Sequence, residues 1–328
     1  MSLAVGIESE RWPYRVPFRI SRGVEEALDV IVVKLEDDRG HIGRGEAAGV
    51  DYAGETMASM RGQLAAVAPA VRAGVSREEL QKLLPPGGAR NALDCALWDL
   101  EAKVTGVSVW SRAGCDPPHP VTTCLTLGID TPEAMAQAAA AARAMSVLKI
   151  KANARQHLEA VRRVHEASPD AAIIVDPNQA WSLAQLNELA PQLAPLGVVL
   201  IEQPVPVSAA AELAGYRGSI PLAADESCAD RGSLGSLSRA FSYVNIKLDK
   251  AGGLTEALAL SSAARAAGFR IMVGCMAGTS LAMAPGMVVA QSAEFVDLDG
   301  PLLHSRDRTP GIEYRNGLMQ VPPRALWG

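Results

Sequence analysis

The sequence predicts an α/β protein in which a closed parallel barrel follows a smaller N-terminal α+β domain. Short runs rich in Val and Ile recur after residue 120, and each run ends in Gly or a charged residue. The ends of successive runs are about 22–27 residues apart, which is the length of one strand and one helix. Eight strands within about 180 residues favour a closed barrel over an open doubly wound sheet.

The first 110 residues mix the two kinds of element. Residues 30–37, VIVVKLED, form an apolar run typical of a buried strand, whereas residues 89–106 have apolar positions at helical spacing and end in Gly106. The GCDPPHP segment at 114–120 then breaks the chain. We therefore expect an α+β domain at 1–115, a barrel at 116–306, and a C-terminal segment at 307–328 that returns to the first domain.

The barrel strands follow from the same pattern. An Ala-rich helical stretch is expected after each of them, and no GxGxxG or GxxxxGK[ST] motif supports nucleotide binding. The predicted strands lie in the runs 121–128, 147–151, 171–178, 198–204, 221–227, 243–249, 270–275 and 293–299. From the second run on, the residues that mark the strand ends are Lys151, Asp176, Glu202, Asp225, Lys247, Gly274 and Asp297.

Composition places the chain among folded, soluble proteins. It is 48% hydrophobic and 20% charged, with a net charge of -5, so nucleic acid is not an expected partner. The first twenty residues carry charges, among them Glu8, Glu10, Arg11 and Arg15, and no apolar core of the signal-peptide type, and no run is long enough to span a membrane. We expect a cytoplasmic protein with no membrane partner. Its five cysteines, odd in number and without a CxxC pair, are expected to be reduced thiols that mostly serve packing.

Charged residues end several of the predicted strands. In a parallel barrel the active site lies at the carboxyl ends of the strands, so these side chains should meet on one rim. Asp176, Glu202 and Asp225 close three consecutive strands. Three converging carboxylates repel one another unless a cation lies between them, and hard oxygen ligands favour Mg²⁺. The sequence predicts a magnesium site.

Lysines flank this carboxylate trio along the chain. Lys149 and Lys151 are two apart on one strand and point the same way, and Lys247 ends a strand beyond the trio. Lys151 and Lys247 would therefore stand on opposite sides of whatever the metal holds, which suits proton transfer at one carbon. We expect Lys149 to support catalysis by tuning its neighbour, because a like charge and a metal both favour a neutral amine.

Five motifs together resemble the enolase superfamily, in particular its muconate-lactonising-enzyme subgroup. They are KxK (149–151), DPN (176–178), EQP (202–204), ADES (224–227) and KLDKAGG (247–253). The resemblance implies a modified (β/α)₇β TIM-type barrel with an N-terminal α+β capping domain that carries the specificity loops. It also implies one Mg²⁺ per subunit held by Asp176, Glu202 and Asp225, with Lys151 and Lys247 as acid and base. Asn178 of the DPN motif would support catalysis, and Lys250 would be a loop or supporting residue.

The end of the eighth predicted strand resembles one particular group within this superfamily. Its end, DLDGP (297–301), is similar to the DxD motif with which dipeptide epimerases hold a substrate ammonium group, and residues 90–100 and 245–260 resemble the L-Ala-D/L-Glu epimerases. Asp297 and Asp299 would then bind the amino group, and Arg22 of the SRG segment (21–23) would bind an acidic second side chain. Residues 49–57 would form a second lid. Residues 274–280, GCMAGTS, lack the acidic residue of many relatives.

The resemblance implies a Mg²⁺-dependent enzyme of murein peptide metabolism that inverts the α-carbon of the C-terminal residue of a dipeptide such as L-Ala-L-Glu. The small dipeptide is its expected partner, and a homo-oligomer is compatible with the family. An N-acylamino-acid racemase and an o-succinylbenzoate synthase of the same superfamily remain alternatives. A hydrolase using Mg²⁺-activated water would not need a lysine on each side of the metal. A non-catalytic peptide-binding protein would not need the lysines at all.

Overall fold

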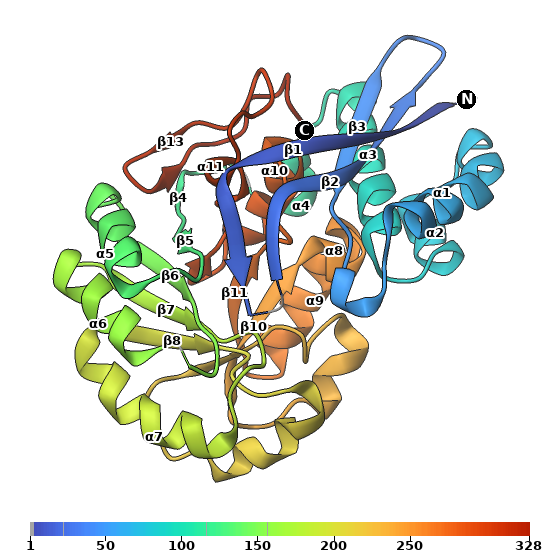
Figure 1. Cartoon of the computed structure of the whole chain (residues 1–328). Coiled ribbons are helices and arrows are strands. Elements are labelled where there is room, and N and C mark those ends of the chain that lie inside the picture. The colour runs from blue at the N-terminus through green and yellow to red at the C-terminus, as the bar shows by residue number, and fades with distance from the viewer. Residues whose placement is uncertain (1–2, 22, 116, 156) are drawn as a thin grey trace.

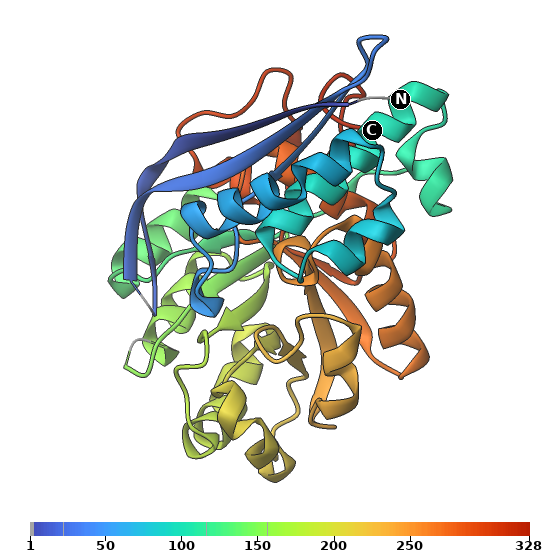
Figure 2. The same cartoon turned by 90° about the vertical axis from the view of Figure 1, so that its right-hand side faces the viewer.

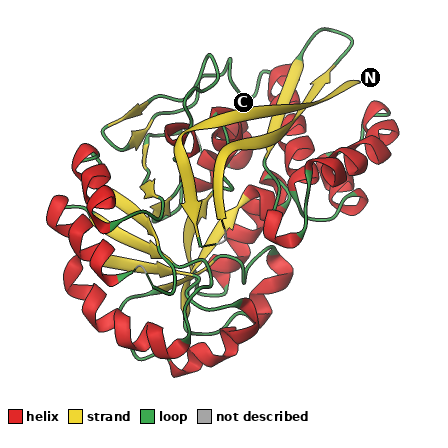
Figure 3. Ribbon diagram, viewed as in Figure 1, coloured by secondary structure: helices red, strands yellow, loops and turns green. Residues whose placement is uncertain are grey.

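A computed structural model describes residues 3–21, 23–115, 117–155 and 157–328. It contains three sheets, which are a three-stranded antiparallel sheet near the N-terminus, an eight-stranded parallel sheet, and a small antiparallel sheet that includes the C-terminal hairpin. Helices surround the parallel sheet, and the N-terminal sheet with its own helices lies across one end of it (Figures 1 and 3). The predicted α/β barrel with a preceding α+β domain is confirmed.

In the N-terminal capping domain, the three-stranded sheet packs against the long helix α3 (Gly88–Thr105). Gly43 and Gly45 lie where this helix approaches most closely, because a Cβ at either position would come within 2.2 Å of a backbone oxygen of the helix. Ile31, Val33 and Leu35 point from the sheet into the core between the two layers. The strands are β1 (Ala4–Ile20), β2 (Gly23–Glu36) and β3 (Ile42–Ala47), and the helices are α1 (Met57–Arg72), α2 (Arg77–Leu83), α3 (Gly88–Thr105) and α4 (Val109–Ala113).

The eight strands of the parallel sheet follow one another in chain order. The sheet curls until the segment before its first strand meets the last one, where Cys124 N donates to Val296 O at 2.9 Å. Each strand ends at, or one residue before, the polar residue or glycine that the sequence marks as its end. The strands are β5 (Leu125–Leu127), β6 (Val147–Lys151), β7 (Ala172–Asp176), β8 (Val198–Glu202), β9 (Leu222–Ala224), β10 (Phe241–Lys247), β11 (Arg270–Gly274) and β12 (Phe295–Val296).

The expectation of an α-helical stretch after every strand is wrong at two places. Only 3₁₀ segments, Val207–Gly215 and Arg231–Ser236, follow β8 and β9. The second contains two glycines and two serines, which disfavour a regular α-helix. The remaining helices are α5 (Pro132–Ala141), α6 (Leu158–Ala167), α7 (Leu183–Leu193), α8 (Leu248–Ala251), α9 (Leu254–Ala266), α10 (Ser280–Ala290) and α11 (Gly300–Leu303).

The predicted strand at 121–128 is divided between two sheets. Its first part, β4 (Val121–Thr122), pairs with β14 (Leu318–Met319), which forms a hairpin with β13 (Tyr314–Arg315). The backbone changes partner at the next two residues, because Thr123 N donates to Gly317 O whereas Cys124 N turns to Val296 O. Only the second part of the predicted strand, β5, belongs to the barrel sheet.

The β1–β2 hairpin extends beyond its own sheet and reaches the barrel (Figures 1 and 2). Near its tip, Ile129 N donates to Arg19 O at 2.8 Å, and Ser21 Oγ lies 3.4 Å from the backbone oxygen of Asn178. The hairpin therefore contacts the loops that follow β5 and β7, on the rim where the charged residues lie.

The C-terminal segment contacts the capping domain. Trp327 Nε1 donates to Cys95 O at 3.0 Å, and Gly328 N donates to the Asp99 carboxylate at 2.8 Å, both on α3. Arg308 pairs with Glu46 of β3 at 2.6 Å. These contacts support the proposal that residues 307–328 return to the first domain. No helix in the described part of the chain is long and apolar enough to cross a membrane.

Candidate active site

A bridging lysine lies at the centre of the charged rim. Lys149 Nζ lies 2.7 Å from carboxylate oxygens of Glu202 and Asp297 and 3.1 Å from one of Asp176, and all four side chains are buried. Burial alone would lower the pKa of Lys149, but the three carboxylates outweigh it and raise this pKa well above its usual value. Lys149 is therefore a fixed positive charge that holds together residues from three strand ends. Its predicted tuning of Lys151 stays a prediction.

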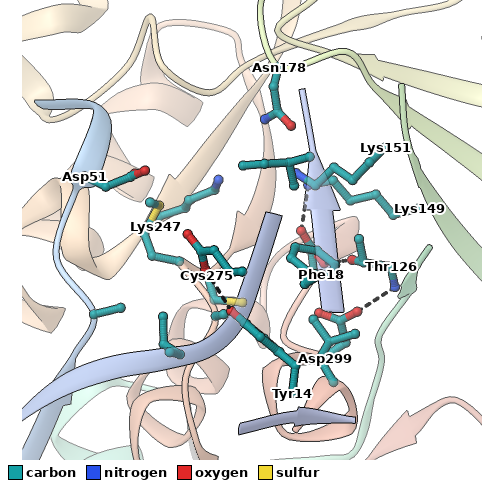
Figure 4. A pocket seen from close by; sticks show the side chains of 18 of the residues that line it. Tyr14, Phe18, Asp51, Thr126, Lys149, Lys151, Asn178, Lys247, Cys275 and Asp299 are labelled. Atoms are coloured by element: carbon teal, nitrogen blue, oxygen red, sulfur yellow. Dashed lines mark hydrogen bonds and ion pairs between the residues drawn. The ribbon is translucent and has the colours of Figure 1, made fainter. Parts of the chain in front are cut away.

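Two other lysines face a common cavity from opposite sides (Figure 4). Lys151 Nζ lies 2.7 Å from Asp176 Oδ2, and Lys247 Nζ lies 2.7 Å from Asp225 Oδ2. Although burial acts in the other direction, Asp225 and Glu202 hold the pKa of Lys247 well above its usual value. The structure thus brings both predicted acid/base residues to one cavity, each beside a carboxylate of the predicted metal site.

The carboxylate trio has the ligand chemistry of a hard-cation site, although the ligand atoms of its three residues do not all lie within 4.8 Å of one another in the described part of the chain. Asp176, Glu202 and Asp225 end or follow adjacent strands and are buried, and each offers only oxygen. Glu202 Oε2 and Asp225 Oδ1 each lie 2.7 Å from a lysine ammonium but outside hydrogen-bonding geometry, so these oxygens have unused acceptor capacity. The donor set is the one Mg²⁺ prefers.

Electrostatics within the trio point to missing positive charge. Burial and the carboxylate of Asp176 raise the pKa of Glu202 to about 7. Burial would raise the pKa of Asp176 too, but Lys151 and Lys149 outweigh it and hold that pKa well below its usual value. Lys247 and Lys250 likewise outweigh burial and hold the pKa of Asp225 well below its usual value. The lysines therefore compensate Asp176 and Asp225, and Glu202 is the carboxylate of the trio that a bound divalent cation would further stabilise.

Two positioning residues around the trio carry roles that the sequence did not assign. Asn245 Nδ2 donates to Glu202 Oε1 at 2.8 Å from β10. Gln203, at a left-handed φ of 36°, accepts the backbone N–H of Asp225 at 3.0 Å. Lys250, expected as a loop or supporting residue, lies buried in α8 and pairs with Asp225 Oδ1 at 2.7 Å, which agrees with a supporting position. The signal in the sequence was only the place of Gln203 inside EQP and of Asn245 at the start of the 245–260 segment.

Asn178 and the aspartate pair also line the cavity. Asn178 adopts a left-handed φ of 46°, and its N–H donates to Asp176 Oδ1 at 2.9 Å, which fixes that carboxylate. Asp299 accepts the N–H of Thr126 at 2.6 Å. Burial and the neighbouring Asp297 raise the pKa of Asp299 to about 7, so a cation placed against the pair would be stabilised.

Cys124 completes the surroundings of Asp297. Among the described residues, Cys124, Asp297 and Asp299 form the group of possible metal ligands whose atoms lie within 4.8 Å of one another. Burial, followed by the two carboxylates, raises the pKa of Cys124 well above its usual value, and Sγ donates to Asp297 Oδ1 at 3.0 Å. A protonated thiol is a poor metal ligand, so this group suits an ammonium better than Mg²⁺.

Residues of the capping domain and of the loop after β11 also line the cavity. The predicted Arg22 lies outside the described residues. All five cysteines are free thiols, as predicted, but Cys124 and Cys275 belong to this site rather than to packing alone. The other lining residues are Tyr14, Phe18, Ile20, Glu25, Leu28, Ala48, Gly49, Asp51, Met276, Ala277 and Leu303.

A barrel with acid/base lysines on either side of three carboxylates defines an enzyme of the enolase type, and comparison with known families agrees. Residues 133–325 match the enolase C-terminal domain-like family, and residues 2–114 match the mandelate racemase/muconate lactonizing enzyme N-terminal domain. The chain belongs to this family.

Relatives of the chain include an epimerase and a racemase. The chain is 42% identical to the L-Ala-D/L-Glu epimerase of Escherichia coli K12 over 97% of this chain and 99% of that protein. It is also 43% identical to an N-acetyl-D-glutamate racemase of a Pseudoalteromonas species, over 76% and 79% of the two chains.

Solved structures show the same fold. An enolase family member from Agrobacterium tumefaciens with homology to dipeptide epimerases, with bound sodium and L-Ala-L-Glu, is 40% identical over 99% of this chain and 100% of that one, with a TM-score of 0.97. A dipeptide epimerase from Methylococcus capsulatus, complexed with Mg and L-Arg-D-Lys, is 30% identical over 100% and 99%, with a TM-score of 0.91.

Gly274, at the end of β11, leaves room for two residues of the site. A Cβ there would lie 2.8 Å from Asn245 Oδ1 and 3.2 Å from Lys247 Cε. Gly274→Ala should displace the Asn245 amide from Glu202 and weaken Mg²⁺ binding by about tenfold or more, the usual cost of losing a partner of a metal ligand. Calorimetric titration with Mg²⁺ measures this. Gly62→Ala, in open space on α1, is the matched control, and unchanged affinity in a folded Gly274→Ala protein would contradict the assignment.

Proposed function

We propose that this protein is a Mg²⁺-dependent dipeptide epimerase that inverts the α-carbon of the second residue of a dipeptide, with L-Ala-L-Glu as its leading substrate. The observation that carries the proposal is the pair Lys151 and Lys247, which face one cavity from opposite sides beside a buried carboxylate trio. The same cavity holds a second, separate acidic pair, Asp297 and Asp299. The two lysines suit proton transfer at one carbon. The carboxylate trio would hold a metal that binds the substrate carboxylate, and the acidic pair would bind a free amino group.

Asp176, Glu202 and Asp225 would hold the metal. When bound there, Mg²⁺ would supply the positive charge that stabilises negative charge developing on the substrate carboxylate as the α-carbon loses its proton. Lys149 holds Asp176 and Glu202 in place through its ion pairs. Asn178 and Asn245 orient the same two carboxylates through hydrogen bonds at 2.9 and 2.8 Å.

Lys151 and Lys247 would move the proton. One lysine, in its neutral form, removes the proton from one face of the α-carbon, and the other, in its protonated form, donates a proton to the opposite face. Exchange of the two roles gives the reverse reaction. Both lysines are paired with carboxylates of the trio, so neutralising the charge of those carboxylates favours the neutral amine that a base requires.

The remaining contacts would select the substrate. Asp297 and Asp299 would bind the free ammonium group of the first residue, because they are buried, adjacent and acidic. Arg22 would pair with the carboxylate of an acidic second side chain.

An N-acylamino-acid racemase is the second candidate. The 43% identity to an N-acetyl-D-glutamate racemase favours it. An acylated nitrogen carries no charge, however, and would give Asp299 no cationic partner from the substrate, whereas Asp297 keeps the Lys149 ammonium at 2.7 Å. The acidic pair therefore favours the dipeptide.

A library of dipeptides incubated with the enzyme in D₂O and Mg²⁺, and read by mass spectrometry, tests the proposed function. We expect deuterium at the α-carbon of the second residue and the highest rates for acidic second residues. Arg22→Met should remove that acidic preference and leave exchange in place, because Arg22 is expected to contact only the side chain. Absence of exchange from every dipeptide would contradict the function, and a retained acidic preference would contradict the role of Arg22 alone.

Asp297→Asn tests the ammonium subsite. Removing one partner of a buried charge pair costs on the order of 2–5 kcal/mol, so activity on L-Ala-L-Glu should fall by well over tenfold. Acetylation of the dipeptide should cause a comparable loss in the wild-type enzyme. If N-acetylamino acids react as fast as free dipeptides, the racemase is the better assignment.

A further inference from the structure

Tyr14 lies in an interruption of the pairing between β1 and β2, and its side chain lines the active-site cavity. Residues Ala4–Pro13 and Phe18–Ile20 of β1 pair with β2, but the register shifts between Pro13 and Phe18. Within this interruption Tyr14 forms an isolated antiparallel bridge with His304, which lies directly after α11. Irregularities of this kind re-aim a side chain, and the Tyr14 ring lines the cavity.

Three contacts fix the strand where Tyr14 stands. Ser305 N donates to Pro13 O at 2.9 Å, and Arg15 Nε donates to Leu302 O at 3.2 Å. The Tyr14 hydroxyl lies 3.5 Å from a carboxylate oxygen of Glu25 on β2. The segment is thus tied to both the hairpin and the barrel.

The Tyr14 ring contacts two other rings. His304 stacks on it with centroids 4.8 Å apart and planes 16° apart, and the Phe18 ring lies 5.5 Å away, tilted by 30°. His304 is fully buried, and neither of its ring nitrogens makes a hydrogen bond of acceptable geometry to a described residue, although the carbonyls of Pro13 and Trp12 lie nearby. Stacking on Tyr14 is therefore a contact through which His304 can position that ring.

The ring lies beside the expected ammonium subsite. Figure 4 shows Tyr14 next to Asp299, with its hydroxyl end near Cys275. Burial is the main cause that raises the pKa of the Tyr14 hydroxyl above its usual value, and Glu25, Cys275 and Asp299 contribute, which agrees with this proximity. In a dipeptide the side chain of the first residue begins roughly 2.5 Å from the amino nitrogen. An ammonium bound by Asp297 and Asp299 therefore brings that side chain close to Tyr14.

We propose that Tyr14 sets the upper size limit for the first residue of the dipeptide, so that the enzyme accepts small residues such as Ala, and that His304 is the positioning residue that holds the ring. This inference rests on the proposed function. A ring stacked on His304, packed against Phe18 and carried by a backbone segment bridged to His304 resists displacement by a larger substrate side chain.

The test compares kcat/KM for L-Ala-L-Glu and L-Leu-L-Glu in the wild-type enzyme and in variants. Tyr14→Ala should shift the ratio toward L-Leu-L-Glu by about tenfold or more, which is the scale of discrimination in apolar pockets. Tyr14→Phe should keep the preference for Ala, because the ring is retained. His304→Phe should also keep it, since stacking suffices, whereas His304→Ala should relax it. Tyr216→Ala, a half-buried tyrosine bonded to Ile220 O, is the matched control and should leave the ratio unchanged.

The outcomes separate this inference from the proposed function. If the wild-type enzyme converts L-Ala-L-Glu but the ratio is unchanged in Tyr14→Ala, the role of Tyr14 is wrong and the function stands. If the wild-type enzyme converts no dipeptide, both fail. Should Tyr14→Ala not fold, Tyr14→Leu is measured in its place, with calorimetric binding of both dipeptides as a second reading. If His304→Phe relaxes the preference as far as His304→Ala does, stacking is not how His304 acts.

Discussion

The buried ammonium of Lys149 is the interaction on which the rest of the site depends. Asp176, Glu202 and Asp297 come from three strand ends, and each would repel the others in a water-free interior. Removing one partner from such a buried pair commonly costs about 3–5 kcal/mol, because the remaining charge is left uncompensated. Lys149 lets the barrel keep its carboxylates converged, and it links the expected metal site to the expected ammonium subsite through one atom.

The groups expected to catalyse the reaction and the groups expected to select the substrate lie in different parts of the fold. The groups that would bind the metal and move the proton lie on barrel strands or directly after them, where main-chain hydrogen bonds hold them rigidly. The groups that would select the substrate come largely from the β1–β2 hairpin, from the segment after β3 and from the loops after β11 and β12. Relatives named for Ala-Glu and for Lys-Arg dipeptides are consistent with such a division, because a change of loop need not disturb the strand ends.

The sequence predicted the strand ends well because each is an apolar run stopped by a polar residue or a glycine, and the ends of parallel strands must meet on one rim. It could not predict Asn245 or Gln203, which look like ordinary polar residues until the fold places them against Glu202 and Asp225. The contact between Tyr14 and His304 joins residues almost three hundred positions apart, and no local sequence pattern predicts it. The domain boundaries, a cytoplasmic location and a homo-oligomeric state stay predictions.

The stereochemistry of hydrogen exchange in two lysine variants tests the central claim most directly. Lys151→Ala and Lys247→Ala would each be incubated in D₂O and Mg²⁺ with L-Ala-L-Glu and, separately, with L-Ala-D-Glu. Two bases on opposite faces predict that neither variant epimerises and that each variant exchanges, at most, the one epimer whose hydrogen faces its remaining lysine. Exchange of the same epimer by both variants, or epimerisation by either at the wild-type rate, would contradict the arrangement.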